Sequence, residues 1–375
     1  MRLERRLPIL VFLLVVVAGF PARPAGLAAD LPASLSDAEF WTLSTTLSEP
    51  DGSFRSENMI SNEMVLARLL PDVIAHARPG GVYLGVGPEQ NFTYLAVMRP
   101  RMAFITDIRR GNLHVLLMYK ALFELSVDRA EFISRLFSKP RPAGLSASST
   151  ARQIMDAYWQ VKTGDEAAYK ANLDGIVRHL TKTRTIPLSK DDIDGVGLAY
   201  RTFYFYGPAI NYSASTSLAP LGGGNSATYW DLMTQADAKG QELSYLSSED
   251  KFRYLKTLNQ NNTIVPLVGN FSGPKTIRAI GDYVRSHGAI VTAFYVSTVE
   301  PYLRRDGSLP VYCASVATLP VDKDSFFIRP GNVQQLLQVA APAAQSAATP
   351  TALSGTGGLG TYQIGLVVPI TGGCG

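Results

Sequence analysis

The sequence contains few of the residues that commonly bind metals. Only two of the 375 residues are cysteines, Cys313 and Cys374, and they do not form a CxxC pair. The four histidines are scattered without ligand spacing, so we expect no metal site. The two cysteines could pair in an oxidising compartment. Because Cys374 lies in the Gly-rich C-terminal tail, two free thiols are favoured over a disulfide.

Runs of like charge are also missing. Charged residues make up 18% of the chain, the formal net charge is +4, and no Lys/Arg run or basic helix is present. Nucleic acid is therefore not expected as a partner. A G-x-S-x-G motif is absent, which removes support for a hydrolase triad. With 46% hydrophobic residues, the chain is long enough to bury the core of one large domain.

The N-terminus differs in composition from the rest of the chain. Three arginines lie within the first six residues, and an apolar run follows over 9–19. Small residues at Gly26 and Ala28 are suited to a cleavage site. This layout predicts a signal peptide over residues 1–28. The apolar run is short for a membrane span of about 20 residues. We therefore expect an exported protein, periplasmic or extracellular, with no membrane span after cleavage.

Strands and helices alternate through the first half of the chain. Helices are predicted over 35–47, with Ser36 as the cap, and over 61–77, with a kink or end at Pro71. A strand at 82–86, a helix at 92–98, a strand at 101–107 and one long helix at 113–137 follow. This order is typical of parallel strands joined by helical crossovers. It predicts a single α/β domain over 30–335, with a Rossmann-like, doubly wound, mostly parallel sheet.

The middle of the chain is interpreted as a helical insertion within that domain, over residues 143–226. Helices are expected at 150–160, 166–179 and 189–199, the last starting with a capping-box pattern at Ser189 and Asp192. The aromatic run 200–206 is expected to pack in a core rather than to form a stacking platform.

The alternation of strands and helices resumes after the insertion. A strand is expected at 263–269, a helix ending at His287 and a strand at 289–296. Segments 311–317 and 326–329 are predicted as an antiparallel edge. The composition of 340–375 predicts a disordered tail.

A glycine turn follows the first strand of the predicted sheet. Gly85 and Gly87 are two residues apart, Glu89 follows, and Asp107 ends the next strand. Glycines there let the backbone approach a ligand, and an acid at the second strand end could bind ribose hydroxyls. An ordinary tight turn with a capping aspartate is the alternative. A dinucleotide fingerprint requires a third glycine where the chain has Gln90, which disfavours NAD and FAD.

Two further polar segments are candidates for ligand contacts. One contains Asn58, Ser61, Asn62 and Glu63, more polar groups than capping a helix requires, although Ser61 or Asn62 could serve as a cap. The other lies at the ends of the later strands and contains Asn270, Tyr295 and Ser297. Because ligands of open α/β sheets bind beyond the carboxyl ends of the strands, we expect these segments to meet the glycine turn.

Several of these segments resemble an uncharacterised bacterial family with a class I SAM-dependent methyltransferase-like fold (SAM, S-adenosylmethionine). The motifs are GGVYLGVGPEQNF, FITDIRRGN, MYKALFELS, SKPRPAGL, NTIVPLVGNFSGP, TAFYVSTVEPYL and FRSENMISNE, and the likeness covers about 35–329. The resemblance implies that fold rather than a particular reaction.

Carried over by position, the resemblance assigns cofactor contacts to four residues. Gly85 and Gly87 would hold the amino-acid end of SAM, with Glu89 beside it and Asp107 at the ribose. The chain departs from the family pattern at Asn270, where an aspartate is expected, and at Thr298, where an asparagine is expected. Asn270 can form hydrogen bonds but cannot act as a base.

Two functional hypotheses follow from the sequence. The first is a methyltransferase-like protein that binds SAM or a related nucleoside, with an unknown methyl acceptor. Glu63 or Tyr295 would be the catalytic base. The second is an exported, non-catalytic ligand-binding protein that retains the fold, since SAM is made in the cytosol. Both predict a small nucleoside-like ligand; protein partners and oligomeric state are not indicated.

Overall fold

The computed structural model describes residues 26–28, 30–63, 65–162, 164–221, 227–329 and 366–370. Most of the predicted signal peptide and of the predicted disordered tail lies outside these ranges. Within them, no helix is both long and apolar enough to cross a membrane.

The centre of the fold is a six-stranded sheet in the order β3-β2-β1-β4-β5-β6. The first five of these are parallel, and β6 runs antiparallel to β5. The strands are β1 (Val82–Val86), β2 (Met102–Asp107), β3 (Ile264–Val268), β4 (Val291–Tyr295), β5 (Phe326–Arg329) and β6 (Leu366–Pro369). The chain adds strands on one side of β1 and then on the other, so the topological switch point lies between β1 and β4. The predicted doubly wound α/β fold is confirmed.

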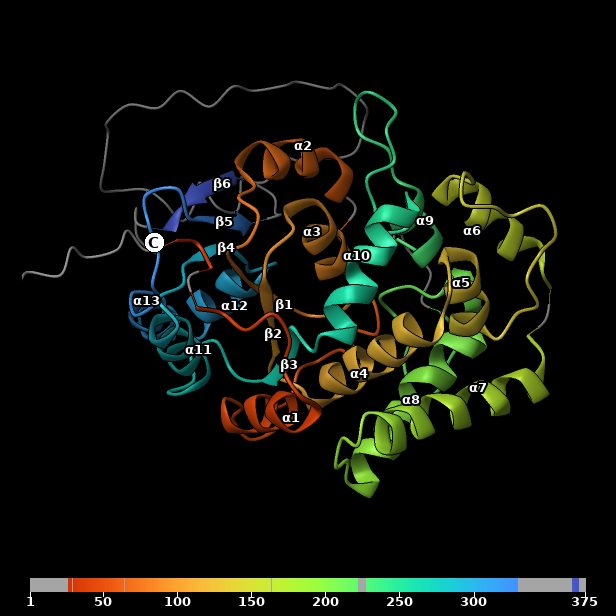
Figure 1. Ribbon diagram of the computed structural model, residues 1–375, viewed down its shortest axis with the longest axis horizontal. Coiled ribbons are helices and arrows are strands. Elements are labelled where there is room, and N and C mark those ends of the chain that lie inside the picture. Colours follow the sequence, from red (N-terminus) through yellow and green to blue (C-terminus); the bar gives the residue numbers. More distant parts are fainter. Residues whose placement is uncertain are drawn as a thin grey trace, which may run out of the picture.

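Helices cover both faces of this sheet (Figure 1). One face carries α2 (Leu66–His76), α3 (Gln90–Met98), α4 (Arg110–Leu125) and α10 (Glu249–Gln260), and the other carries α11 (Thr276–Ser286), α12 (Val299–Arg305) and α13 (Leu309–Val316). Covered on both sides, β2, β3 and β4 are buried along their whole length.

The first helix, α1 (Asp37–Thr46), packs beside β3, and Ser36 caps it in a capping box with Glu39, as predicted. The hydroxyl of Ser44 donates to the carbonyl of Pro266 at 2.6 Å. Pro266 lies in β3, at the end of the strand order, where a missing backbone N–H breaks no ladder bond on the outer side.

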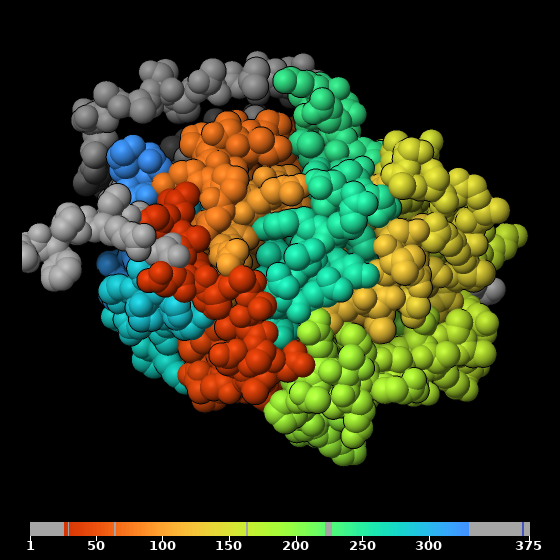
Figure 2. Space-filling model, in the orientation of Figure 1, coloured from red at the N-terminus to blue at the C-terminus, as the bar shows by residue number. Residues whose placement is uncertain are grey.

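A group of helices, here called the helical lobe, extends beyond α4 (Figures 1 and 2). It comprises α5 (Arg129–Phe137), α6 (Ala151–Gln160), α7 (Glu166–Arg178), the π-helix η1 (His179–Thr183), α8 (Lys190–Tyr206), the 3₁₀ turn η2 (Gly207–Ala209) and α9 (Tyr229–Thr234). The capping box at Ser189 is present, as predicted. Tyr200 and Phe203 are fully buried, so packing explains this part of the aromatic run, whereas Phe205 is exposed.

Several predicted elements differ from the structure. The helix predicted over 113–137 is two helices, because Asp128 caps a new helix by accepting from the Glu131 N–H. Segment 311–317 lies largely in α13 instead of a strand, because Tyr312 and Val316 bury one face at helical spacing. β5 is parallel to β4, because α12 and α13 form a crossover between the two strands.

The edge of the sheet comes from within the segment predicted to be disordered. Leu366–Pro369 form β6 against β5, because two adjacent valines in an apolar stretch favour a strand. Cys313, on α13, is disulfide-bonded, which corrects the preference for free thiols. The other cysteine of the sequence, Cys374, lies outside the described residues.

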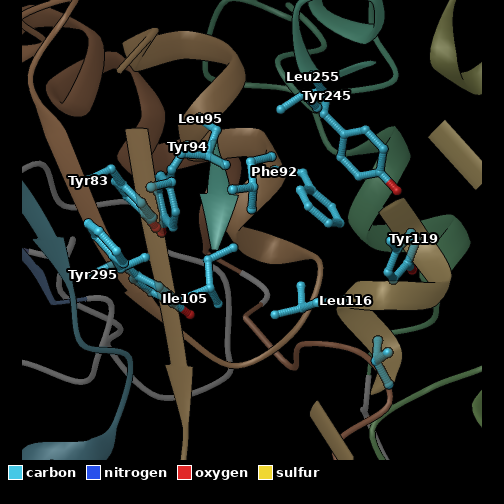
Figure 3. Packing of buried hydrophobic residues seen from close by; sticks show 14 of the residues in the cluster. Tyr83, Phe92, Tyr94, Leu95, Ile105, Leu116, Tyr119, Tyr245, Leu255 and Tyr295 are labelled. Atoms are coloured by element: carbon cyan, nitrogen blue, oxygen red, sulfur yellow. The ribbon is translucent and has the colours of Figure 1, made fainter. Parts of the chain in front are cut away.

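Buried aromatic side chains form the core around β1 and α3 (Figure 3). Tyr83, Tyr94 and Tyr295 lie together at β1 and β4, with Tyr94 and Tyr295 ring centroids 4.8 Å apart. Phe92 packs on the other side of α3 against Tyr119, at 5.1 Å. The core therefore reaches directly beneath the carboxyl end of the central strand.

Candidate functional site

The glycine turn lies at the carboxyl end of β1, and its two glycines have different roles. A Cβ on Gly85 would lie 1.9 Å from Asn91 Oδ1, so this glycine makes room for a protein side chain. Gly87 is buried, has φ of 76°, and has nothing within 4 Å of where its Cβ would lie. Only Gly87 therefore borders open space.

The side chain of Asn91 fixes the shape of this turn. Its Nδ2 donates to the carbonyls of Val86, Gly87 and Pro88, at 3.0, 3.1 and 2.8 Å. Its Oδ1 accepts from the hydroxyl of Tyr83 at 2.9 Å. Both polar atoms of the Asn91 side chain are therefore hydrogen-bonded within the turn and β1, which holds the turn in one conformation.

Glu89, predicted as a SAM contact, is fully buried and bound to the segment before α2. Its two carboxylate oxygens accept from the Ser61 N–H at 3.0 and 3.1 Å. Burial raises the pKa of Glu89 to about 8, opposed by the Ser61 bond and reinforced by the neighbouring Glu63 carboxylate. Ser61 thus meets the glycine turn through its backbone and does not cap α2, which starts at Leu66 with no side-chain cap.

Glu63 and Tyr295, the two predicted catalytic residues, are in direct contact. Glu63 Oε1 accepts from the Tyr295 hydroxyl at 2.5 Å and from the Ser297 hydroxyl at 2.7 Å. Burial raises the pKa of Glu63 to about 7, and these two hydrogen bonds act against the shift. Burial also raises the pKa of Tyr295 well above its usual value. Glu63 Oε2 has no partner among the described residues.

Asp107 ends β2 as predicted, but it is bound to the residue two positions later. Its Oδ1 accepts from the Arg109 N–H at 2.9 Å and lies 3.2 Å from Arg109 Nε. Burial raises the pKa of Asp107, and the Arg109 guanidinium opposes that shift. Only 6% of Asp107 is exposed. A ribose could reach this carboxylate only after a neighbouring segment moved.

The remaining predicted contacts are spread more widely. Asn270 turns its Oδ1 back onto the N–H and hydroxyl of Ser272, both at 3.0 Å. Asn62 is exposed, whereas Asn58 has φ of 44° and a buried Oδ1 with no partner among the described residues. Thr298 precedes α12 without capping it.

Sequence reasoning missed the first turn of α4. Asn112 Nδ2 donates to the Gly87 carbonyl at 3.0 Å, while its buried Oδ1 is unpaired among the described residues. The Gln90 amide, at the start of α3, is likewise buried with both polar atoms unpaired. The polar residues after Asp107 could have indicated this turn. They were not considered because the helix was predicted to begin at Leu113, whereas α4 begins at Arg110.

Among the residues that the structure describes, no group of three or more His, Cys, Asp or Glu side chains could hold a metal ion. An open groove of about 990 Å³ lies between α7 and α8, lined by residues such as Leu173, Val177 and Leu198. It belongs to the helical lobe and not to the carboxyl edge.

Comparison with models of protein families identifies the family of this chain. The model of a family described as a domain of unknown function (DUF7790) matches residues 58–188 and 220–350, more than half of the chain. The chain belongs to this family. The DUF7790 match contains the glycine turn, Asp107 and the Glu63–Tyr295 pair, and it omits 189–219, which include α8. A search of curated proteins gives no match to the sequence.

Proposed function

We propose that this DUF7790 protein binds SAM or a related nucleoside at the carboxyl edge of β1 and β2. The open space beside Gly87 is the observation that carries the proposal. A left-handed glycine at the end of the central strand, next to the topological switch point, is where the backbone of such folds approaches a ligand.

Unsatisfied polar atoms around Gly87 support a polar ligand there. Asn112 Oδ1 is on the same amide that binds the Gly87 carbonyl, so it lies within a few ångströms of the glycine. Gln90 contributes an unpaired acceptor and an unpaired donor three residues along the chain. Buried polar groups left unpaired cost about 1–3 kcal/mol each. A ligand that hydrogen-bonds them would recover that free energy.

The residues present fit the parts of such a ligand. Gly87 and the start of α3 would accommodate its polar end, and Asp107 would accept hydrogen bonds from ribose hydroxyls once exposed. SAM, when bound, supplies a methyl group on a sulfonium. This chain would contribute mainly orientation. The Glu63 carboxylate, held by Tyr295 and Ser297, is the candidate proton acceptor, with a pKa of about 7 suited to that role.

A second candidate is an exported, non-catalytic protein that uses the same site for binding alone. It is favoured because Glu63, Glu89 and Asp107 all have partners within the protein. Asn270, where the family pattern has an aspartate, is an amide and cannot serve as a base, which also favours binding without catalysis. The disulfide of Cys313 supports an oxidising compartment, as the N-terminal sequence predicts. A reporter active only outside the cytoplasm, fused after residue 40, would test export; a silent reporter contradicts it.

Calorimetric titration of the mature chain with SAM, its demethylated product and adenosine tests the proposal. We expect Asp107→Ala to weaken binding about tenfold to hundredfold, because charge-assisted hydrogen bonds worth roughly 1.5–3 kcal/mol are lost. Asp282→Ala, on the exposed face of α11, is the matched control and should bind like the wild type. Absence of binding at millimolar nucleoside rejects the proposal. Binding without methyl transfer from labelled SAM to any acceptor favours the second candidate.

A further inference from the structure

The segment 48–58, here called the strap, covers the carboxyl ends of β2 and β3. The Glu49 N–H donates to the Val268 carbonyl at 2.8 Å, and the Gly52 N–H donates to the Ile108 carbonyl at 2.9 Å. A Cβ on Gly52 would lie 2.6 Å from Ile108 Cγ1, so a glycine is needed for the strap to lie this close. Asp51 is near enough to Asp107 to raise the pKa of that carboxyl group.

Glu49 holds the strap at the start of α11. Its Oε1 accepts from the N–H groups of Lys275 and Thr276 at 2.8 and 3.0 Å, and its Oε2 accepts from Asn270 N–H at 3.0 Å. A Cβ on Gly273 would lie 2.1 Å from Glu49 Oε2, so that glycine provides the space for the carboxylate. Carboxylates are favoured at helix N-termini by the helix dipole.

Asp51 makes a second attachment of the same kind. Its Oδ1 accepts from the Arg110 N–H at 2.6 Å, at the first residue of α4. The far end of the strap is held by polar and aromatic contacts. The Arg55 guanidinium donates to the hydroxyl of Tyr302 at 2.5 Å, and Phe54 packs edge-on against the same ring at 5.5 Å.

Apolar burial does not hold the strap. No side chain from 48 to 58 is buried, whereas the flanking Leu47 and Met59 are 9% and 5% exposed. Water can replace the polar contacts of the strap, so its local opening should cost much less than global unfolding. Leu47 and Met59 remain fixed in the core and would act as the two ends of the moving segment.

We propose that the strap is a lid that opens to admit the ligand to Asp107 and is held closed by the carboxylates of Glu49 and Asp51. The inference rests on the proposed function for the identity of the ligand, but opening itself is a property of the free protein. It explains how a carboxylate that is only 6% exposed could serve a binding site. It also assigns a role to Glu49 and Asp51, which precede the family match.

Hydrogen exchange of the ligand-free protein tests the lid. In Glu49→Gln/Asp51→Asn, the amides of the strap should exchange at least tenfold faster, while those of the central strand β1 are unchanged. Gly273→Ala changes no residue of the strap, but its Cβ would displace the Glu49 carboxylate. It should therefore accelerate exchange of the strap amides in the same way. Asp282→Asn on α11 is the control for loss of an acidic charge. Unchanged strap exchange in both variants, or equal acceleration of the β1 amides, overturns the lid.

Adenosine binding separates this inference from the proposed function. With a lid, stopped-flow association should be faster for the double variant than for the wild type. If the strap exchanges faster but neither protein binds any nucleoside, the opening stands and the assigned ligand is wrong. If adenosine binds both proteins at the same rate, the site stands and the lid is rejected.

Discussion

At Glu63, burial and hydrogen bonding act on one carboxyl group in opposite directions, and burial dominates. The pKa of about 7 in the folded protein lies above the usual 4.5, so the folded state binds the proton more tightly than the unfolded state. The resulting stabilisation is fully present below pH 4.5 and is lost as the pH rises through 7. Glu89, with a pKa of about 8, extends the same loss to higher pH.

Glu63→Gln should therefore reduce the decline in stability between pH 5 and pH 8. The amide keeps an acceptor for Tyr295 and Ser297 and does not ionise. The rise in the pKa of Glu63 from 4.5 to about 7 corresponds to a loss of roughly 3 kcal/mol of stability at pH 8 in the wild type. The free energy of unfolding in urea, measured across this pH range, checks the prediction. Glu166→Gln, on the surface of α7, is the control and should leave the pH dependence as in the wild type. A parallel decline in Glu63→Gln and the wild type would show that Glu63 is not the titrating group.

The two glycines of the turn should respond differently to alanine. Gly85→Ala places a Cβ into Asn91, whose amide is held by three carbonyls, so we expect loss of the folded state or destabilisation by several kcal/mol. Gly87→Ala meets no atom and should cost about 1–2 kcal/mol, from its left-handed backbone. Thermal unfolding of both variants checks this, and equal melting temperatures would contradict it.

At the scale of elements, the break between α4 and α5 depends on one cap. Asp128 accepts from the Glu131 N–H at 2.7 Å and pairs with Arg141 at 2.9 Å. Asp128→Ala should cost about 1 kcal/mol in urea unfolding. Asp128→Asn retains a capping oxygen and should recover most of that loss. If both variants were equally destabilised, the ion pair and not the cap would be responsible.

Local signals were sufficient for several elements of the fold. Capping residues at Ser36 and Ser189, the glycine turn and the apolar runs of β1 to β4 were all readable, because each acts within a few residues. Segment 311–317 was misread because a short apolar run fits a strand or a helix equally well. The segment forms a helix, α13, that packs against α11 and α12, and this packing, which involves other parts of the sequence, decides between helix and strand.

For the whole molecule, the disulfide of Cys313 is the feature that should respond to redox conditions. Reduction should lower the free energy of unfolding by about 2–4 kcal/mol, because the unfolded chain regains conformational freedom. Urea unfolding with and without dithiothreitol measures this. Cys313→Ser should be insensitive to the reductant, and an equally insensitive wild type would contradict the prediction.

The sequence by itself determined the alternating strands and helices, the parallel sheet and the residues at its carboxyl edge. These follow from periodicity and from glycines that act locally. Only the tertiary structure decided what each polar residue does there. Glu89 binds Ser61, Glu63 binds Tyr295, and the strap binds the backbone of Ile108 next to Asp107, through contacts between segments as much as 232 residues apart. The pKa shifts come from burial, which is set by the packing of the whole fold and is not encoded in any local motif.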